Sequence, residues 1–191
     1  MTKDEFRSMA RAERARHTKE ELAAMSAAAL TRLYATEAWK SAASVWTYVS
    51  VKDEVDTRSL IARALAEGKR VAVPRVTGKS LVFYEFTAFE ALQEGYHQLP
   101  EPPADGRRSF DPEALVILPG LAFSEEMDRI GYGGGFYDRF LSAHGTMKTA
   151  APAYDFSVFP TLPAEKTDHK TDLIVTDRRM IRSVPEQGGI I

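Results

Sequence analysis

The chain has 191 residues, a formal net charge of −2, 44% hydrophobic and 27% charged residues, and no cysteine. These values are ordinary for a soluble globular protein, and the length suits one domain with a sizeable core. The near-neutral charge gives no basic field for nucleic acid or an anionic membrane, and the lack of cysteine excludes a disulfide framework, a thiolate metal site and a cysteine nucleophile. No apolar stretch resembles a signal peptide or could span a bilayer, so a cytoplasmic protein is expected.

The first half of the chain predicts helices and strands in alternation. Residues 3–36 are rich in helix-favouring types, and the capping-box pattern from Thr18 to Glu21 predicts that a second helix begins there. A further helix is expected from the Asp56–Thr57 N-cap to about Glu67, with Gly68 as its stop. β-Branched and aromatic residues predict strands at 45–49, 71–76 and 81–86. Pro74 indicates an edge position or a strand end in the second of these.

The second half continues the alternation after a proline-rich passage at 93–113, which predicts a loop. The apolar run 114–118 is typical of a central strand buried on both faces. A helix is expected from about Phe136 to His144, ended by Gly145, and strands at 151–156 and 173–176. The pattern predicts an α/β fold, a Rossmann-like three-layer sandwich with a mostly parallel central sheet and helices on both faces, as a single domain over residues 1–191.

Between the apolar strand and that helix lies RIGYGGGFYDRFL, residues 129–141. Clustered glycines indicate sharp turns or close approach to a ligand, and loop amides before a helix N-terminus form an anion site. The spacing matches neither a dinucleotide fingerprint, because Phe136 takes the last glycine position, nor a Walker loop, because Gly-Lys-Ser/Thr is absent. A plain strand-to-helix connection is the alternative, but the neighbouring Arg129 and three aromatic rings favour a binding loop.

The chain resembles the 5-formyltetrahydrofolate cyclo-ligase family, also called methenyltetrahydrofolate synthetases. The family signature is Leu-Pro-Gly or Met-Pro-Gly, a Phe, and then Arg-Leu-Gly-x-Gly-x-Gly-Tyr-Tyr-Asp; this chain has LPGLAF at 118–123 and RIGYGGGFYD at 129–138. The resemblance extends over nearly the whole chain, through Lys3 and Arg7, DEVDT at 53–57, GK at 68–69, VPR at 73–75, PEP at 100–102, Asp168 and TDLIVT at 171–176. Together, in this order, the motifs are specific.

The resemblance implies an ATP-dependent ring closure. The formyl oxygen of 5-formyltetrahydrofolate takes the γ-phosphoryl group of ATP, N10 attacks the activated carbon, and 5,10-methenyltetrahydrofolate, ADP and phosphate are released. Such chemistry needs positioning and charge neutralisation by cations, amides and Mg²⁺ more than covalent help from the protein. The expected partners are the folate and ATP, with no nucleic acid and no membrane, and the expected protein is a monomer or a weak dimer.

The resemblance also implies roles for individual residues. Arg129 and Tyr137 are the expected catalytic groups. ATP binding is expected from the N-terminal segment and the glycine loop: Lys3, Asp4, Glu5, Phe6, Arg7, Arg129, Ile130, Gly131, Tyr132, Gly133, Gly134, Gly135, Phe136 and Tyr137. The folate is expected to contact Val49, Glu54, Tyr132, Gly133, Gly134, Gly135 and Phe136. Magnesium is expected between Asp138 and Asp172, because hard oxygen ligands suit this ion.

Plainer interpretations of these residues stay open. Lys3, Arg7 and Arg11 recur every four residues, which by itself indicates a solvated basic face of a helix. Glu54 and Asp138 could be acids that stabilise helix N-termini, and Asp172 an ordinary strand-entry residue. Arg75, at a strand end, is either a phosphate contact or a surface charge.

The chain departs from the family pattern at three places. Gly134 replaces a lysine that many relatives have, Phe136 replaces a tyrosine, and Ser157 replaces a glutamine, so polar contacts from these positions are in doubt. Two other functions remain possible. A non-catalytic folate- or nucleotide-binding protein would retain the folate without ATP hydrolysis, and a sugar-phosphate or CoA-handling enzyme would ignore folate.

Overall fold

A computed structural model describes residues 1–145 and 147–183. In these residues a seven-stranded sheet runs in the order β12-β11-β9-β6-β1-β2-β3. Its five inner strands are parallel, and the edge strands β12 and β3 are antiparallel to their neighbours. The strands are β1 (Ser44–Thr47), β2 (Arg70–Thr77), β3 (Ser80–Glu85), β6 (Leu115–Ile117), β9 (Thr149–Ala153), β11 (Leu173–Thr176) and β12 (Met180–Arg182). The predicted mostly parallel α/β sheet is confirmed.

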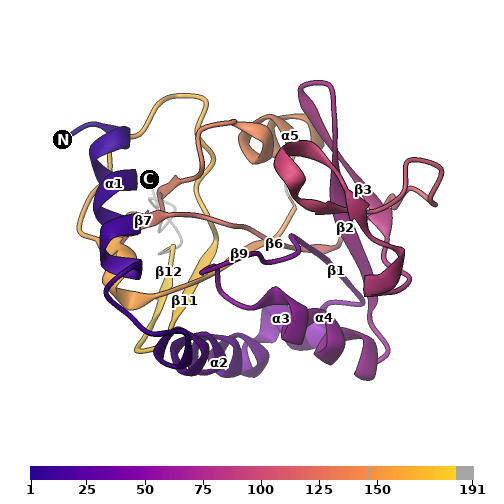
Figure 1. The fold of residues 1–191 in the computed structure, drawn as a ribbon, viewed down its shortest axis with the longest axis horizontal. Helices are drawn as coiled ribbons and strands as arrows, with labels where there is room; N and C mark the ends of the chain where they lie inside the picture. The colour runs from indigo at the N-terminus through magenta and orange to yellow at the C-terminus, as the bar shows by residue number, and fades with distance from the viewer. Residues whose placement is uncertain (146, 184–191) are drawn as a thin grey trace, which may run out of the picture.

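Helices cover the sheet on two sides, as Figure 1 shows. One side carries α2 (Lys19–Ala35), α3 (Glu37–Ser41) and α4 (Thr57–Ala66), and the other carries α5 (Phe136–His144). Side chains of alternating direction along the strands feed two separate cores. Leu33, Leu60 and Ile117 belong to the first core, whereas Phe140, Val116 and Ile174 belong to the second.

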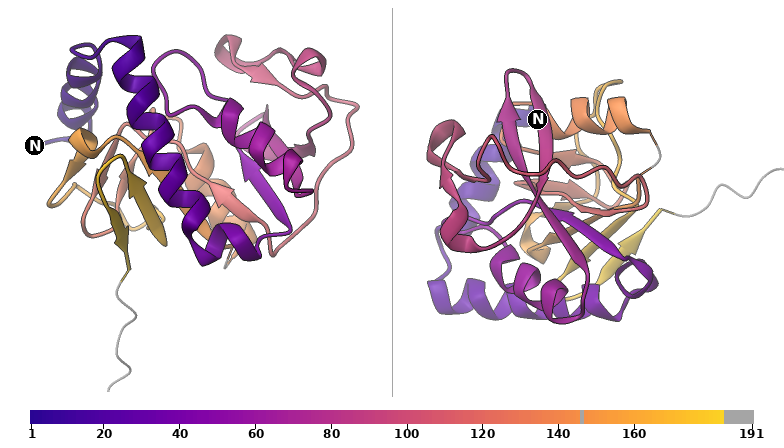
Figure 2. Two further views of the ribbon diagram at one scale, coloured as in Figure 1. Left: turned by 90° about the horizontal axis from the view of Figure 1, so that it is seen from below. Right: turned by 90° about the vertical axis from the view of Figure 1, so that its right-hand side faces the viewer.

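The N-terminal helix α1 (Lys3–Arg14) stands apart from these layers, beside a small second sheet (Figure 1). That sheet has the order β10-β7-β8 and consists of β7 (Ala122–Ser124), β8 (Arg129–Ile130) and β10 (Val158–Phe159). Phe6 of α1 packs edge to face on Phe159 and joins a small core with Ile130 and Leu162. Figure 2 shows α1 and α2 as two separate helices joined by a short turn. The helix is thus anchored on the same β7–β8 unit that leads into the glycine loop.

Most predicted elements are confirmed within one to three residues. Both α1 and α2 begin with a capping box, from Thr2 to Glu5 and from Thr18 to Glu21. Asp56 caps α4, and α5 has the predicted bounds. β1 pairs with β2 only as far as Ala72, so at Pro74 the strand has β3 alone as a partner and no ladder bond is lost.

The missed elements are short. They are the small sheet, β12, the helix α3, the short strands β4 (Gln93–Glu94) and β5 (Pro100–Glu101), and the single helical turns at Phe89–Ala91, Tyr96–Gln98 and Asp155–Ser157. Elements of two to five residues carry too little periodicity to be recognised from a pattern. In the described part of the chain, no helix combines the length and apolar character needed to cross a membrane.

Candidate active site

A cavity of about 930 Å³ lies at the carboxyl ends of the central strands. Tyr48 and Val49, which follow β1, and Pro119, which follows β6, line it. The remaining walls come from segments that are distant in the sequence: α1, the loop 51–54, the segment 96–101, the glycine loop, and the loop 165–168 before β11. Loops at this edge of a parallel sheet converge and form its ligand site. The cavity is therefore the candidate active site.

The glycine loop, residues 131–135, joins β8 to α5 along one side of the cavity. Gly133 and Gly135 have φ angles of 106° and 61°, which residues with a side chain rarely adopt. Gly135 is the N-cap of α5 and offers no side-chain acceptor to the first amides of the helix. Those amides and the exposed loop backbone form a surface suited to an anion, as the sequence predicted.

Arg129 lies buried at the start of this loop. Its Nη2 donates to Asp138 Oδ1 over 2.8 Å, and its Nη1 donates to the Pro119 carbonyl over 3.3 Å. Its Nε is buried without a hydrogen-bond partner among the described residues. Asp138 comes from the first turn of α5, so this ion pair joins β8, the end of β6 and α5 beside the cavity.

Tyr137 is the neighbouring group, with its ring 5.9 Å from the Arg129 guanidinium. Its hydroxyl is buried and has no partner in the described chain. Burial raises the pKa of Tyr137 well above its ordinary value, although the Arg129 charge opposes this. The phenol therefore remains protonated at neutral pH and can donate a hydrogen bond. Because a buried hydroxyl without a partner costs free energy, a ligand atom that accepts from it would be favoured.

The helix α1 brings part of the predicted nucleotide segment into the cavity. Lys3 pairs with Asp168 at 2.7 Å and with Glu165 at 3.1 Å, and Arg7 Nε donates to the Gly131 carbonyl over 2.9 Å. Asp4 also lines the cavity and pairs with Arg7. Glu5 and Phe6, also expected at ATP, instead form the capping box and the anchor of α1.

Glu54 and Val49 form a different part of the wall, near the end of β1. Glu54 Oε2 accepts a hydrogen bond from the Val51 amide over 2.9 Å. Burial raises the pKa of Glu54, while the Tyr132 hydroxyl, the Val51 amide and the Arg14 charge partly offset this effect. The second oxygen of a carboxylate held in this way can accept N–H donors from a ligand.

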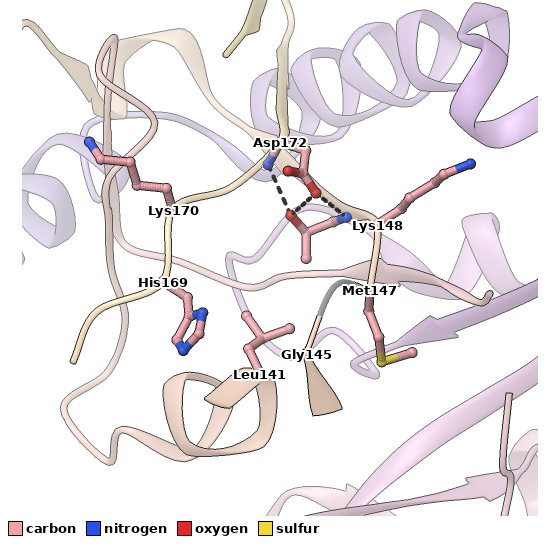
Figure 3. A pocket seen from close by; sticks show the side chains of 8 residues that line it. Leu141, Gly145, Met147, Lys148, His169, Lys170 and Asp172 are labelled. Atoms are coloured by element: carbon pink, nitrogen blue, oxygen red, sulfur yellow. Dashed lines mark hydrogen bonds between the residues drawn. The ribbon is translucent and has the colours of Figure 1, made fainter. Parts of the chain in front are cut away.

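Asp172 lies elsewhere, in a smaller pocket of about 320 Å³ beside Leu141, Lys148 and His169. Both the amide and the hydroxyl of Thr149 donate to Asp172 Oδ2 over 2.8 Å, and Figure 3 draws the hydrogen bonds at Asp172 as dashed lines. Asp172 precedes β11 and Thr149 begins β9, so both are at the amino ends of parallel strands. The structure therefore places Asp172 and Asp138 in different pockets, although the amide of His169, in the segment that leads to Asp172, donates to Asp138 Oδ1 over 3.3 Å. The role of Asp172 as a metal ligand stays a prediction from the resemblance alone.

The other residues in doubt are also placed. Arg75 donates to the Pro102 carbonyl over 2.8 Å and lies 3.6 Å from Glu101, so its charge has a protein partner. Ser157 is buried, donates to the Tyr154 carbonyl over 2.7 Å and is not among the residues that line the cavity. A Cβ at Gly134 would come within 2.7 Å of the Phe136 ring. A larger residue at position 134 would clash with the Phe136 ring, so these two departures from the family pattern are compatible with each other.

Two buried charged residues near the cavity were not found from the sequence. Glu101 is 4% exposed, and its Oε1 accepts from the Val76 and Tyr96 amides over 3.1 and 3.3 Å, which holds the segment 96–101 against β2. Arg14, at the end of α1, is 4% exposed and donates to the Gly120 carbonyl over 2.8 Å. The sequence signal for Arg14 is its place seven residues after Arg7, two helical turns along the same face.

Comparisons with known proteins point to one family. The model of the 5-formyltetrahydrofolate cyclo-ligase family matches residues 1–177. A Schizosaccharomyces pombe protein named "Probable 5-formyltetrahydrofolate cyclo-ligase" is 32% identical, over 76% of this chain and 80% of its own. The Escherichia coli K12 "5-formyltetrahydrofolate cyclo-ligase" is 31% identical, over 90% of this chain and 98% of its own.

Among solved structures, the Aquifex aeolicus 5,10-methenyltetrahydrofolate synthetase superposes with a TM-score of 0.83 at 29% identity, covering 100% of this chain and 96% of that one. A synthetase of the same name from Mycoplasma pneumoniae has a TM-score of 0.73 at 20% identity, over 93% and 99% of the two chains, and it supports the fold. The glycine loop, the cationic helix and the fold thus agree with the sequence matches. The chain belongs to the 5-formyltetrahydrofolate cyclo-ligase family.

Proposed function

We propose that this protein uses ATP to convert 5-formyltetrahydrofolate to 5,10-methenyltetrahydrofolate, with release of ADP and phosphate. The observation that carries the proposal is that a single cavity presents two chemically different walls. Lys3, Arg7, Arg129 and the glycine loop offer positive charge and amides to phosphates, while Glu54 and Val49 offer a carboxylate acceptor and an apolar surface to the pterin ring. Both substrates of the proposed reaction have complementary partners there.

The proposed chemistry transfers the γ-phosphoryl group of ATP to the formyl oxygen of the folate, and ADP leaves. N10 then attacks the formyl carbon, and the phosphorylated oxygen leaves as phosphate, which closes the ring. Arg129 is the proposed cation at the transferred group, because it is fixed by Asp138 and the Pro119 carbonyl and its position costs no reorganisation during the reaction. The protonated Tyr137 hydroxyl is the proposed hydrogen-bond donor beside it.

Magnesium fits the oxygen donors of the cavity. Asp138 faces the phosphate-binding wall, and Mg²⁺ usually takes one or two carboxylates together with substrate phosphates. No group of three or more His, Asp or Glu side chains in the described residues forms a metal cage by itself, which suits an ion that arrives with the nucleotide. When bound, Mg²⁺ would offset phosphate charge during transfer.

The decisive test is an absorbance assay for methenyltetrahydrofolate formed from 5-formyltetrahydrofolate, with and without Mg-ATP. We expect product only when both ATP and Mg²⁺ are present, in equal amounts to the ADP released. A protein that retains the folate but never hydrolyses ATP would instead be a folate-binding protein on this fold. We also propose that the protein is a monomer located in the cytoplasm. Sedimentation of the pure protein would test its oligomeric state, and fractionation of cells would test its location.

A double variant of α1 separates nucleotide binding from folate binding. Lys3→Met with Arg7→Met is expected to raise the KM for ATP by roughly tenfold to a hundredfold, because charge-assisted hydrogen bonds of ~1.5–3 kcal/mol are lost. The KM for the folate should change little. Point variants are preferred to deletion of residues 1–7, because the deletion would also remove Phe6, which anchors α1. Arg11→Met, an exposed change on the same helix, is the control, and an unchanged ATP KM in the double variant would contradict the proposed contacts.

A further inference from the structure

Arg14 is a buried cation without a carboxylate in direct contact. It ends α1 and is only 4% exposed, yet no acidic group of the described residues pairs with it within salt-bridge distance. Its Nε is buried without a hydrogen-bond partner in the same residues. A buried charge is costly unless other groups compensate for it, so its position needs an explanation beyond the packing of α1.

The contacts of Arg14 lead to the pterin-facing wall. Its Nη2 donates to the Gly120 carbonyl over 2.8 Å, and its Nη1 lies 3.5 Å from the Tyr132 hydroxyl. Tyr132 and Glu54 line the same cavity, and the Tyr132 hydroxyl lowers the pKa of the Glu54 carboxylate. The Arg14 guanidinium also lies 5.5 Å from the Tyr154 ring. Arg14 therefore contacts a side chain that shares the cavity wall with Glu54.

Arg14 is the positive charge that lowers the pKa of Glu54. The titratable and charged groups that interact electrostatically with Glu54 come from α1, the end of β1, its own loop, the glycine loop, α5 and the end of β9: Arg14, Tyr48, Asp53, Tyr132, Tyr137 and Tyr154. The tyrosines are protonated at neutral pH, because burial raises the pKa of each of them. Asp53 adds negative charge, which raises the pKa of Glu54 and opposes the effect of Arg14.

We propose that Arg14 is a positioning residue for folate binding: it holds the Tyr132 hydroxyl at the cavity wall that Glu54 shares, and it supplies positive charge to the Glu54 carboxylate. This inference rests on the proposed function, in which Glu54 binds the pterin. It also means that α1 serves both substrates, with Lys3 and Arg7 at the nucleotide and Arg14 at the folate wall.

The test compares three variants with the exposed control Arg11→Met. Arg14→Met removes the charge at similar length, Arg14→Lys keeps the charge without the planar fork, and Tyr132→Phe removes only the hydroxyl. For each protein, the dissociation constant of 5-formyltetrahydrofolate is measured without nucleotide from pH 5 to pH 8, together with the thermal midpoint and the KM for ATP.

We expect Arg14→Met to weaken folate binding at pH 7 by roughly tenfold to a hundredfold and to leave the KM for ATP nearly unchanged. Glu54 must be ionised to accept pterin N–H groups, and binding is lost as the pH falls through its folded pKa. Loss of the Arg14 charge raises that pKa further, so the acid limb of the binding curve should move to higher pH. Arg14→Lys should restore the position of the limb, and Tyr132→Phe should show a smaller loss of affinity.

Wild-type affinity and an unmoved acid limb in a folded Arg14→Met protein would overturn the inference. If Arg14→Met does not fold, Arg14→Lys and Tyr132→Phe carry the test, and full affinity with the wild-type limb in Tyr132→Phe would overturn it equally. Failure of the proposed function gives different results: either the wild-type protein and Arg11→Met do not bind 5-formyltetrahydrofolate at any pH, or they bind it and form no product with Mg-ATP.

Discussion

Replacing Gly133 with valine is expected to abolish measurable binding of both ATP and 5-formyltetrahydrofolate while the protein remains folded. Gly133 has a φ angle of 106°, and the nearest neighbours of an added Cβ are the Arg7 guanidinium atoms at 3.8 Å. A branched side chain would fill the space between the loop and Arg7 where the phosphates are proposed to lie. The backbone strain is ~1–2 kcal/mol, whereas a domain of this kind has ~5–15 kcal/mol of stability.

The matched control is Gly78→Val in the turn between β2 and β3. Gly78 also has a positive φ angle, 61°, but nothing lies within 4 Å of an added Cβ there. Both variants should therefore lose a similar amount of stability, measured by thermal unfolding, and only Gly133→Val should lose ligand binding, measured by calorimetry. Normal binding of both ligands by Gly133→Val would show that the loop is merely a connector.

Asp138→Asn is expected to lower kcat on the order of a hundredfold or more and to raise the Mg²⁺ concentration needed for half-maximal rate. The asparagine oxygen can still accept from Arg129, which now lies 2.8 Å from the carboxylate, so the site geometry should be retained while the negative charge is lost. Folate binding without nucleotide should remain nearly intact. Initial rates over a Mg²⁺ titration at saturating ATP and folate measure the effect.

Asp172→Asn provides the comparison that the structure makes informative. Its carboxylate accepts from Thr149 at the amino ends of β9 and β11, away from the large cavity. The variant should lose about 1 kcal/mol of stability and keep the Mg²⁺ dependence of the wild-type protein. An equal rise in the Mg²⁺ requirement for both variants would contradict this separation and would support the pairing of the two aspartates predicted from the family resemblance.

Local patterns in the sequence were enough to predict the long elements. The capping box at Thr18, the Asp56 cap of α4 and the bounds of α5 depend on residues within one turn of each helix end. The apolar run at 114–118 likewise predicted the central strand β6. Short-range hydrogen bonds and periodic burial determine such features, so the sequence records them directly.

The glycine loop was also predictable as a candidate site, because its glycines, Arg129 and Tyr137 are adjacent in the chain. Its conformation confirms that two of these glycines take angles that other residues avoid. The Arg129–Asp138 pair spans nine residues and was not predicted, although both members were singled out. The resemblance to a known family supplied the chemistry, which composition and spacing could not.

The sequence by itself thus determined the α/β class, the main elements and the loop at which the nucleotide is proposed to bind. Only the tertiary structure decided that Arg14 lies buried in contact with Tyr132, 118 residues further along the chain, and that Asp172 lies at the amino end of β11. The physical reason is that strand direction and sheet order determine which loops meet. A carboxylate at the amino end of a parallel strand lies at the edge of the sheet opposite to its ligand site, whatever the neighbouring residue types.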